Sequence, residues 1–453
     1  MSKYRYSLHN YHAIEHADIV IDGITVLAGE NGCGKSTLSR WLYYTINGAT
    51  EFDVFLFREY VSDIQRIISR WDFISRDILR VTSGVTELHR QSQFPFIRTA
   101  DTQLEQLVTD DAAGVEIVER VQEIFLQTLN ALVEQVYAYL NMEESVVRKE
   151  RVLSFLDIRM SEDESPTDIV ARFKDSHERL IEKRTNKLFR RSQGRAAKDF
   201  FQIIGDEFEE TDTPPLELQL YEDGVELFEG EHVASVYNLR KAIYVDTPMA
   251  ITADRGTNVF WRELCDMMYS VSDAKNTLEN SLLIKRVKRV IGGEAKLVED
   301  DVFGGMEELR YVSEDGQIDI ELAKAATGVK TFTYLQRLLQ NGYLTDNTLL
   351  LIDEPEAHLH PQWIVEYARL LVLINKKLGV KIMIASHNPD MVAAIRSIAE
   401  KEEMLGNTHF YLAEKNMDGS RYVYNDLGQE IDDIFRSFNI ALDRIKLYGS
   451  DSL

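Results

Sequence analysis

Apolar and polar positions alternate along the first thirty residues, as in half-buried β-strands, and the pattern then changes to helical spacing. The alternation predicts short strands over 3–11, 13–21 and 23–30, the last an apolar run that ends at a glycine-rich turn. A helix is predicted to begin at Lys35, after that turn. From about Phe52 to Gln202, apolar residues recur at helical spacing among many charges. This stretch predicts an inserted helical arm.

Strand patterns return after the helical stretch. Residues 214–228 alternate around Asp223-Gly224, a pair typical of a tight hairpin turn. Further elements are expected in this order: strands over 242–248 and 307–322, a helix over 330–342, a buried strand over 348–353, another helix, and an apolar strand over 381–386. Apolar strands that alternate with helices predict an α/β fold with a mixed sheet, interrupted by the arm.

The expected division is a head made of residues 1–51 and 206–453, with residues 52–205 forming the arm. Within the arm, the acidic stretch 160–173 contains a proline and then Thr167 and Asp168. We expect a turn there, with these residues as the N-cap of a second helix, at the tip of the arm.

Composition fits a folded protein of more than one structural unit. The chain has 453 residues, of which 44% are hydrophobic and 28% charged. It has no apolar run of about 18 residues or more and no signal-peptide layout at its start, so we expect a cytoplasmic location and no membrane contact. The two cysteines, Cys33 and Cys265, are expected to be free thiols.

The net charge is strongly negative. With 51 Lys+Arg against 75 Asp+Glu, the formal charge of -24 opposes wrapping a polyanion over the whole surface, so any nucleic-acid contact is expected to be local. One basic run is the candidate for such contact; its residues are Arg179, Lys183, Arg184, Lys187, Arg190, Arg191 and Arg195. The competing interpretation is a solvated helix face that pairs with nearby acids.

A phosphate-binding loop is indicated at residues 29–37, which read GENGCGKST and match G-x-x-x-x-G-K-[ST] between an apolar strand and a helix. The backbone N–H groups of such a loop surround the β- and γ-phosphates of a nucleotide. Lys35 supplies a positive charge to the phosphates, and Ser36 offers a hydroxyl to Mg²⁺. The expected nucleotide-binding set is Asn31, Gly32, Cys33, Gly34, Lys35, Ser36 and Thr37.

A second motif follows the strand at 348–353. The apolar run ends in Asp353 and Glu354, which predicts two acids at the carboxyl edge of a parallel sheet. Asp353 is expected to hold Mg²⁺ and Glu354 to polarise the attacking water. His387, after the strand at 381–386, is expected to contact the γ-phosphate, although a purely structural histidine is the alternative.

The pair His358 and His360 follows the acidic motif. Two histidines separated by one residue suggest a zinc site, but no third and fourth ligand stands nearby in the sequence. A loop that contacts a neighbouring subunit is the favoured interpretation.

Together, GENGCGKST, LLLIDEPEAHLHP and IASHNP resemble the ABC-type ATPases that include SMC-like and OLD-like proteins. The resemblance implies ATP and Mg²⁺ as ligands and two heads that enclose ATP between them. It also implies a signature loop that completes the pocket of the other head. Here Thr327, Gly328 and Lys330 resemble the short OLD-like signature, and a helix is expected to begin near Lys330. This signature lacks one glycine of the fuller transporter form, so slow ATP hydrolysis is one expected consequence. No clear Q-loop glutamine stands out; Gln65 and Gln93 are the candidates.

The resemblance extends to the ATPase subunits of two-component anti-phage systems such as Septu, related retron modules and PARIS. The segment after His387 is too short for the Toprim nuclease of many OLD-like proteins, and no other nuclease centre is evident. This implies a homo-oligomeric ATPase that controls a separate effector nuclease, of HNH type in Septu-like systems. The alternatives are an SMC-like DNA-repair ATPase whose arm engages DNA, and a transporter ATPase, which would be about half as long with a fuller signature.

Overall fold

The computed structural model describes residues 2–72, 74, 75, 78, 95–109, 114–141, 146–156, 165–246, 259–271, 277–300, 306–357 and 359–436. The chain forms two compact units. One, the head, consists of Met1–Thr50 and Phe200–Leu453. The other, the helical unit, consists of Glu51–Asp199.

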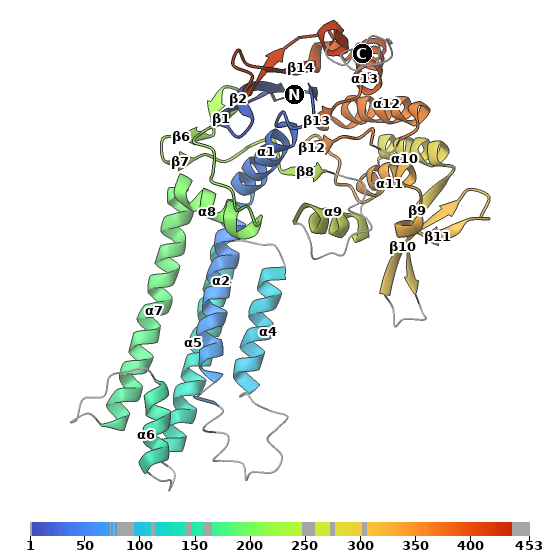
Figure 1. The fold of residues 1–453 in the computed structure, drawn as a ribbon. Coiled ribbons are helices and arrows are strands. Elements are labelled where there is room, and N and C mark those ends of the chain that lie inside the picture. The colour runs from blue at the N-terminus through green and yellow to red at the C-terminus, as the bar shows by residue number, and fades with distance from the viewer. Residues whose placement is uncertain are drawn as a thin grey trace, which may run out of the picture. The chain divides into compact units, whose positions relative to one another are not determined.

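A ten-stranded mixed sheet forms the centre of the head (Figure 1). Its strand order is β5-β4-β1-β2-β15-β14-β3-β13-β12-β8. The strands are β1 (Tyr4–Tyr11), β2 (Ile14–Ile21), β3 (Ile24–Ala28), β4 (Glu217–Glu222), β5 (Val225–Glu226), β8 (Lys241–Val245), β12 (Thr348–Asp353), β13 (Lys381–Ser386), β14 (Thr408–Lys415) and β15 (Tyr422–Asp426). The predicted α/β fold with a mixed sheet is therefore confirmed.

Five neighbouring strands, β14, β3, β13, β12 and β8, run parallel, whereas β4, β1 and β2 pair antiparallel. In the parallel block, Asp353 of β12 pairs with Ala385 of β13, and Ser386 of β13 pairs with Ala28 of β3. The carboxyl ends of these three strands consequently meet at one edge of the sheet.

The parallel strands are buried on both faces, which explains their continuous apolar sequences. Because successive side chains point to opposite faces, Leu350 and Ile352 of β12 join a core cluster with helices α11 and α12. The alternate residue Asp353 faces the other way, toward helix α1, where it accepts a hydrogen bond from Ser39.

Helices cover the sheet, and two small sheets accompany it. The head helices are α1 (Lys35–Thr50), α8 (Ala197–Glu207, whose first three residues belong to the helical unit), α9 (Val259–Tyr269), α10 (Leu278–Ile291), α11 (Thr327–Gln340), α12 (Pro361–Leu378) and α13 (Pro389–Lys401), with 3₁₀ turns η3 (Leu322–Lys324) and η4 (Leu405–Asn407). The small sheets are β9 (Gly293–Asp300) with β10 (Met306–Ser313) and β11 (Asp319–Glu321), and β6 (Phe228–Glu229) with β7 (His232–Val233).

The helical unit is an assembly of α-helices: α2 (Phe52–Arg70), α4 (Pro95–Thr109), α5 (Val115–Leu140), α6 (Val146–Phe155) and α7 (Pro166–Gly194). Helix α5 packs against α4 and α7, and α2 packs against α4 and α7. Buried side chains such as Trp71 and Phe125, with ring centroids 5.2 Å apart, hold these helices together. The apolar positions at helical spacing are therefore the faces that the helices bury against one another.

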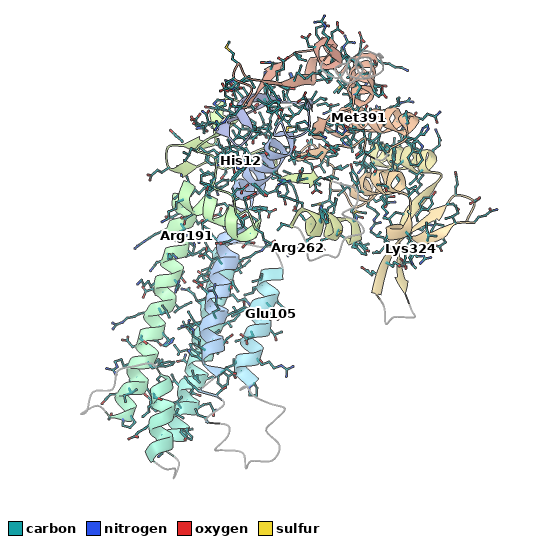
Figure 2. The ribbon with its side chains drawn as sticks, in the orientation of Figure 1. His12, Glu105, Arg191, Arg262, Lys324 and Met391 are labelled. Atoms are coloured by element: carbon teal, nitrogen blue, oxygen red, sulfur yellow. The ribbon has the colours of Figure 1, made fainter. Side chains whose placement is uncertain are left out.

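Most of the basic run on α7 is engaged by acids of the same unit. The distances from guanidinium nitrogens to carboxylate oxygens are those of ion pairs. They are 2.8 Å for Arg184 and Asp63, 2.6 Å for Arg191 and Glu59, 2.9 Å for Arg191 and Asp199, and 3.3 Å for Arg195 and Asp53. Figure 2 marks Arg191 on α7. Lys183, Lys187 and Arg190 are exposed and meet no acidic partner within the part of the chain that the structure describes.

Several local predictions can be scored. The hairpin at Asp223-Gly224 is confirmed: it joins β4 to β5, and the two residues have φ of 50° and 86°, as a type I′ turn requires. The N-cap expected at Thr167 and Asp168 was wrong, because Ser165 caps α7 by accepting a hydrogen bond from the Asp168 N–H, with Pro166 as the first helical residue.

Two further differences concern the segment before β12. Helix α11 begins at Thr327, three residues before Lys330, and strand β9 was not predicted. The acidic stretch preceding Ser165 lies largely outside the described residues. Among the helices that the structure describes, none is long and apolar enough to cross a membrane.

Candidate functional site

The phosphate loop joins β3 to α1 at the carboxyl edge of the sheet. Gly32 and Gly34 have φ of 82° and 97°, a region that side-chain-bearing residues rarely adopt. A Cβ at Gly34 would also lie 2.7 Å from Cγ1 of Ile14 on β2. The backbone conformation therefore requires glycine at both positions, and the close approach of β2 is a second requirement at Gly34.

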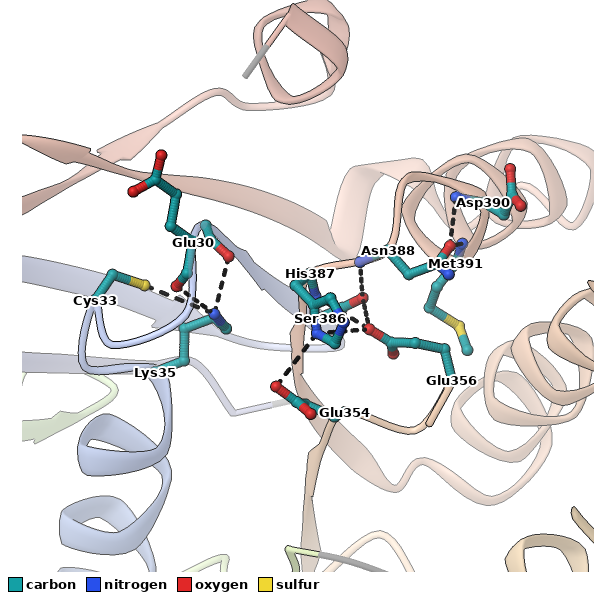
Figure 3. Close-up of polar contacts among 11 residues, drawn as sticks. Glu30, Cys33, Lys35, Glu354, Glu356, Ser386, His387, Asn388, Asp390 and Met391 are labelled. Carbon is teal, nitrogen blue, oxygen red and sulfur yellow. Dashed lines mark hydrogen bonds and ion pairs between the residues drawn. The ribbon is translucent and has the colours of Figure 1, made fainter. Parts of the chain in front are cut away.

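Lys35 is held within the loop. Its side chain is buried, and Nζ donates to the carbonyl oxygens of Gly29 and Glu30, each at 2.9 Å (Figure 3). Cys33 is buried beside it, and the Tyr424 hydroxyl donates to the Cys33 carbonyl at 3.2 Å. The ammonium group is thus pre-positioned under the loop rather than extended into solvent.

The remaining predicted residues lie in the loop, at Asn31 and Gly32, and in the first turn of α1, at Ser36 and Thr37. Asn31 and Gly32 are exposed, whereas Ser36 and Thr37 are half-buried. The first N–H groups of a helix have no partner within the helix, and its positive dipole end attracts anions. The loop and helix together are thus built to bind a phosphate group.

Asp353 is a buried carboxylate at the end of β12. Oδ1 accepts a hydrogen bond from Ser39 at 2.8 Å, and Oδ2 accepts one from Tyr244 at 2.8 Å. Burial raises the pKa of Asp353, although hydrogen bonds from Ser36, Ser39 and Tyr244 oppose that rise. The ionised form of Asp353 is therefore disfavoured in this setting.

Glu354 and His387 lie together beyond Asp353. Glu354 has φ of 46°, a strained conformation for a residue other than glycine, and its N–H donates to the Ala385 carbonyl at 2.8 Å. His387 Nδ1 lies 3.2 Å from Glu354 Oε1, and both side chains are more than two-fifths exposed. Both predicted catalytic residues consequently face the same accessible space (Figure 3).

Glu356 is hydrogen-bonded to the segment that carries His387. Its carboxylate is almost fully buried, and Oε1 accepts hydrogen bonds from the Ser386 hydroxyl at 2.8 Å and the His387 N–H at 3.1 Å. Burial raises the pKa of Glu356, with the same hydrogen bonds acting in the opposite direction. Glu356 therefore fixes the backbone that carries His387.

The signature-like residues lie at the start of α11. A Cβ at Gly328 would lie 2.8 Å from the Trp363 ring, so α11 approaches α12 closely there. Lys330 is buried, and its Nζ donates to the Ala323 carbonyl at 2.6 Å. Burial lowers the pKa of Lys330. The Lys330 side chain thus holds the turn before α11, and what this loop offers outward is the amino end of the helix with Thr327.

The other candidates are placed as follows. His360 is the N-cap of α12, with Nδ1 accepting from the Gln362 N–H at 3.4 Å, and His358 lies outside the described residues. Gln65 is on α2 in the helical unit, and Gln93 also lies outside the described residues.

Sequence reasoning missed four residues around Asp353 and His387, namely Ser39, Tyr244, Asp246 and Glu356. Ser39 follows Lys35 by one helical turn. Tyr244 is the next-to-last residue of β8, which pairs with β12, and Asp246 directly follows β8, so their positions at the edge of the sheet carried a usable signal. The negative charge of Asp246 adds to the rise in the pKa of Asp353.

The site fits ATP and Mg²⁺. Mg²⁺ prefers oxygen ligands, and Ser36 and Asp353 place a hydroxyl and a carboxylate side by side. Asp353 and Ser36 would hold the ion, and the loop N–H groups and Lys35 would hold the phosphates. When bound, the ion would neutralise phosphate charge.

The comparison with protein families agrees with this chemistry. The family model described as "AAA domain, putative AbiEii toxin, Type IV TA system" matches residues 162–393, just over half of the chain. The match runs from α7 to α13 and includes Asp353, Glu354 and His387. No curated protein sequence matches the chain.

Similar solved structures include an Smc head domain with an extended coiled coil, bound to the C-terminal domain of ScpA, from Pyrococcus furiosus. It is 12% identical, with a TM-score of 0.34 over 98% of this chain and 100% of that chain. An SmcHead bound to the C-winged helix domain of ScpA is 12% identical, with a TM-score of 0.37 over 94% and 98%. An ATP-binding cassette of an ABC transporter in its ADP conformation is 10% identical, with a TM-score of 0.34 over 97% and 98%.

The burial of Asp353 generates a stability prediction. Because burial raises the pKa of Asp353, the folded protein keeps a proton at pH values where the unfolded chain has lost it. The free energy of unfolding therefore falls as pH rises from the unfolded to the folded pKa of Asp353, and the ionised carboxylate remains destabilising at higher pH. Asp353→Asn should therefore raise the melting temperature at pH 7.5 without Mg²⁺, and the gain should shrink toward pH 5. It should also abolish the increase in ATP affinity that Mg²⁺ produces.

Differential scanning fluorimetry across this pH range, with ATP titrations at low and high Mg²⁺, measures both effects. Glu231→Gln, which changes an exposed acid in the turn between β6 and β7, is the matched control and should alter neither quantity. A lower melting temperature for Asp353→Asn at pH 7.5 would contradict the assignment of Asp353 as a destabilising buried charge.

Proposed function

Because this chain belongs to the family described as "AAA domain, putative AbiEii toxin, Type IV TA system", we propose that it is the ATP-binding and ATP-hydrolysing regulatory subunit of a bacterial anti-phage defence complex. In this proposal it forms a homodimer or larger homo-oligomer and controls a separate effector nuclease, with an HNH enzyme favoured. The observation that carries the ATPase part is the convergence of Lys35, Ser36, Asp353, Glu354 and His387 on one edge of the sheet.

In this proposal each residue of the site has a separate role in ATP binding or hydrolysis. Lys35 exchanges its two carbonyl partners, Gly29 and Glu30, for phosphate oxygens when ATP arrives. Glu354 orients the attacking water as general base, and His387, placed 3.2 Å from Glu354, contacts the transferred phosphate. The contact between Glu354 and His387 has to open for the water to enter.

The signature-like segment gives the reason for proposing a dimer. Its outward-facing part is the amino end of α11, whose positive dipole end can attract the γ-phosphate held by a second head. We therefore assign Thr327 and Gly328 to the pocket of the partner, and Lys330 to the support of their turn.

Control of an effector is supported by the resemblance of GENGCGKST, LLLIDEPEAHLHP and IASHNP to the ATPase subunits of two-component defence systems. In this reading ATP holds the assembly in one state, and loss of nucleotide or a phage trigger releases the nuclease. A slowly hydrolysing site suits such a role, because the bound state then persists between triggers.

A second function is favoured by one observation on the helical unit. Lys183, Lys187 and Arg190 lie about one helical turn apart along α7 and line a groove, to which the acids Glu182 and Asp199 also belong. Exposed cations at this spacing can follow a phosphate backbone. This supports the alternative of an SMC-like DNA-repair ATPase whose arm engages DNA, against which the net charge of -24 weighs.

Substitutions at Lys35 and Glu354 test the ATP site as a pair. Lys35→Ala removes the buried charge under the loop and should abolish ATP binding, whereas Glu354→Gln should retain ATP and accumulate the ATP-bound dimer because hydrolysis stops. Isothermal titration calorimetry and size-exclusion chromatography with light scattering report the two outcomes. Unchanged ATP affinity in Lys35→Ala would refute the assignment of the phosphate loop.

The defence role is tested by purifying the tagged chain from its native operon, with and without ATP, and identifying co-purifying proteins by mass spectrometry. A nuclease should be recovered in stoichiometric amount with the unmodified chain and with Glu354→Gln in ATP, and in smaller amount with Lys35→Ala. Recovery of the ATPase alone, or with DNA, would overturn the effector proposal.

The alternative is tested on the α7 cations. If the arm binds DNA, Lys183→Glu/Lys187→Glu/Arg190→Glu should abolish duplex binding in a fluorescence-anisotropy titration, and the unmodified chain should show a log–log salt slope of about −3, since three phosphates are neutralised. Arg98→Glu, a change at an exposed arginine on α4 outside the groove, is the control and should bind DNA like the unmodified chain. Absence of DNA binding by the unmodified chain at low salt would exclude this function.

A further inference from the structure

A cluster of metal-ligand side chains lies on the antiparallel flank of the head, away from the acids of the ATP site. His9 of β1 pairs directly with His16 of β2, and Ser7 pairs with Asp18. His9, His16 and Asp18 share one face of the hairpin, because the residues between them point into the core. Antiparallel pairing thus brings two imidazoles and a carboxylate together, although His9 and His16 are seven residues apart in the sequence and Asp18 follows His16 by two.

The separations within this cluster suit a tetrahedral metal site. His16 Nε2 lies 3.2 Å from Asp18 Oδ2, and His9 Nε2 lies 3.6 Å from Asp18 Oδ1. One ligand atom from each of the three residues lies within 4.8 Å of the others. Metal–ligand bonds of about 2.0–2.1 Å at tetrahedral angles place ligand atoms about 3.3–3.4 Å apart. Both distances lie close to that value, each to a different oxygen of Asp18.

An unpartnered nitrogen provides an independent observation. His9 Nε2 is buried and has no hydrogen-bond partner among the described residues. Buried polar atoms are nearly always paired, so such an atom calls for an explanation. The two rings stack with centroids 4.2 Å apart and planes inclined by 23°, so one ring has to turn for both nitrogens to point at a single ion. A bound cation would give the His9 nitrogen its partner.

The residues around the cluster resemble the outer sphere of metal sites. Asp18 Oδ1 accepts a hydrogen bond from the Ser7 hydroxyl, which leaves the carboxylate oriented. Glu217 Oε2 of β4 lies 3.9 Å from His9 Nδ1, the nitrogen opposite the free one. In metal sites a carboxylate commonly orients a ligating histidine through its second nitrogen. Arg5 lies 3.3 Å from Asp18 Oδ2, but its side chain is 60% exposed and is free to turn away.

We propose that His9, His16 and Asp18 bind one zinc-class transition-metal ion, with a fourth position open to water. Two imidazoles select such an ion over Mg²⁺, which prefers oxygen ligands only. The ion joins β1 to β2, and Ile14 at the start of β2 supports the phosphate loop at Gly34. The site therefore stabilises the strand pair that backs the ATP pocket, and it stands independently of the proposed function.

The test uses the full, untagged chain after removal of metals by chelation. Titration with Zn²⁺ in a calorimeter should show one ion per chain, and Co²⁺ should give the visible absorption of a four-coordinate site. His9→Ala/His16→Ala should lose this binding, and Ser7→Ala should weaken it about 10-fold. Zn²⁺ should raise the melting temperature of the unmodified chain and leave that of the double variant unchanged.

Two controls separate the outcomes. His12→Ala changes a histidine in the turn between β1 and β2 (Figure 2), 3.8 Å from Asp212, and should bind Zn²⁺ like the unmodified chain. Retained ATP binding by the double variant shows that it folds; Asp18→Asn, a change of similar volume, serves if it does not. Failure of the unmodified chain to bind Zn²⁺, or unchanged binding by the double variant, would overturn the proposal, and the second result would place the ion elsewhere, for example at His358 and His360.

Discussion

The parallel pairing of β3, β13 and β12 is the constraint on which the candidate site depends. It places Ala28, Ser386 and Asp353 at one edge, so that three segments far apart in the sequence deliver the phosphate loop, His387 and the acids to the same place. A slip of one residue in β12 would turn Asp353 to the opposite face, away from Ser39 and α1. The apolar residues on both faces of these strands, which fix the register, are therefore as necessary to the site as the polar residues themselves.

Elements with strong local signals could be predicted from the sequence. The strand–loop–helix at 24–50 was evident from a contiguous motif, and the Asp223-Gly224 turn from the chemistry of two residues. Asp353 and Glu354 stood out because they end an unbroken apolar run. In each case a few neighbouring residues carry the whole physical requirement.

The parts that were missed depend on partners distant in the sequence. Tyr244 donates to Asp353 across 109 residues, and Glu356 accepts from Ser386 across 30. The N-cap of α7 was misplaced because Ser, Thr and Asp all favour that position, and only Pro166 as first helical residue distinguishes Ser165. Likewise, the basic run on α7 could not be divided into paired and unpaired residues before α2 was known to lie against it.

The left-handed backbone of Glu354 has a consequence for engineering. That conformation costs about 1–3 kcal/mol in a residue with a Cβ, and glycine would relieve it. Selection of variants for heat resistance alone would thus favour losing the very carboxylate assigned to water activation. Directed evolution of a more thermostable protein would need a simultaneous screen for turnover, because at this position thermal stability favours glycine and hydrolysis requires the carboxylate.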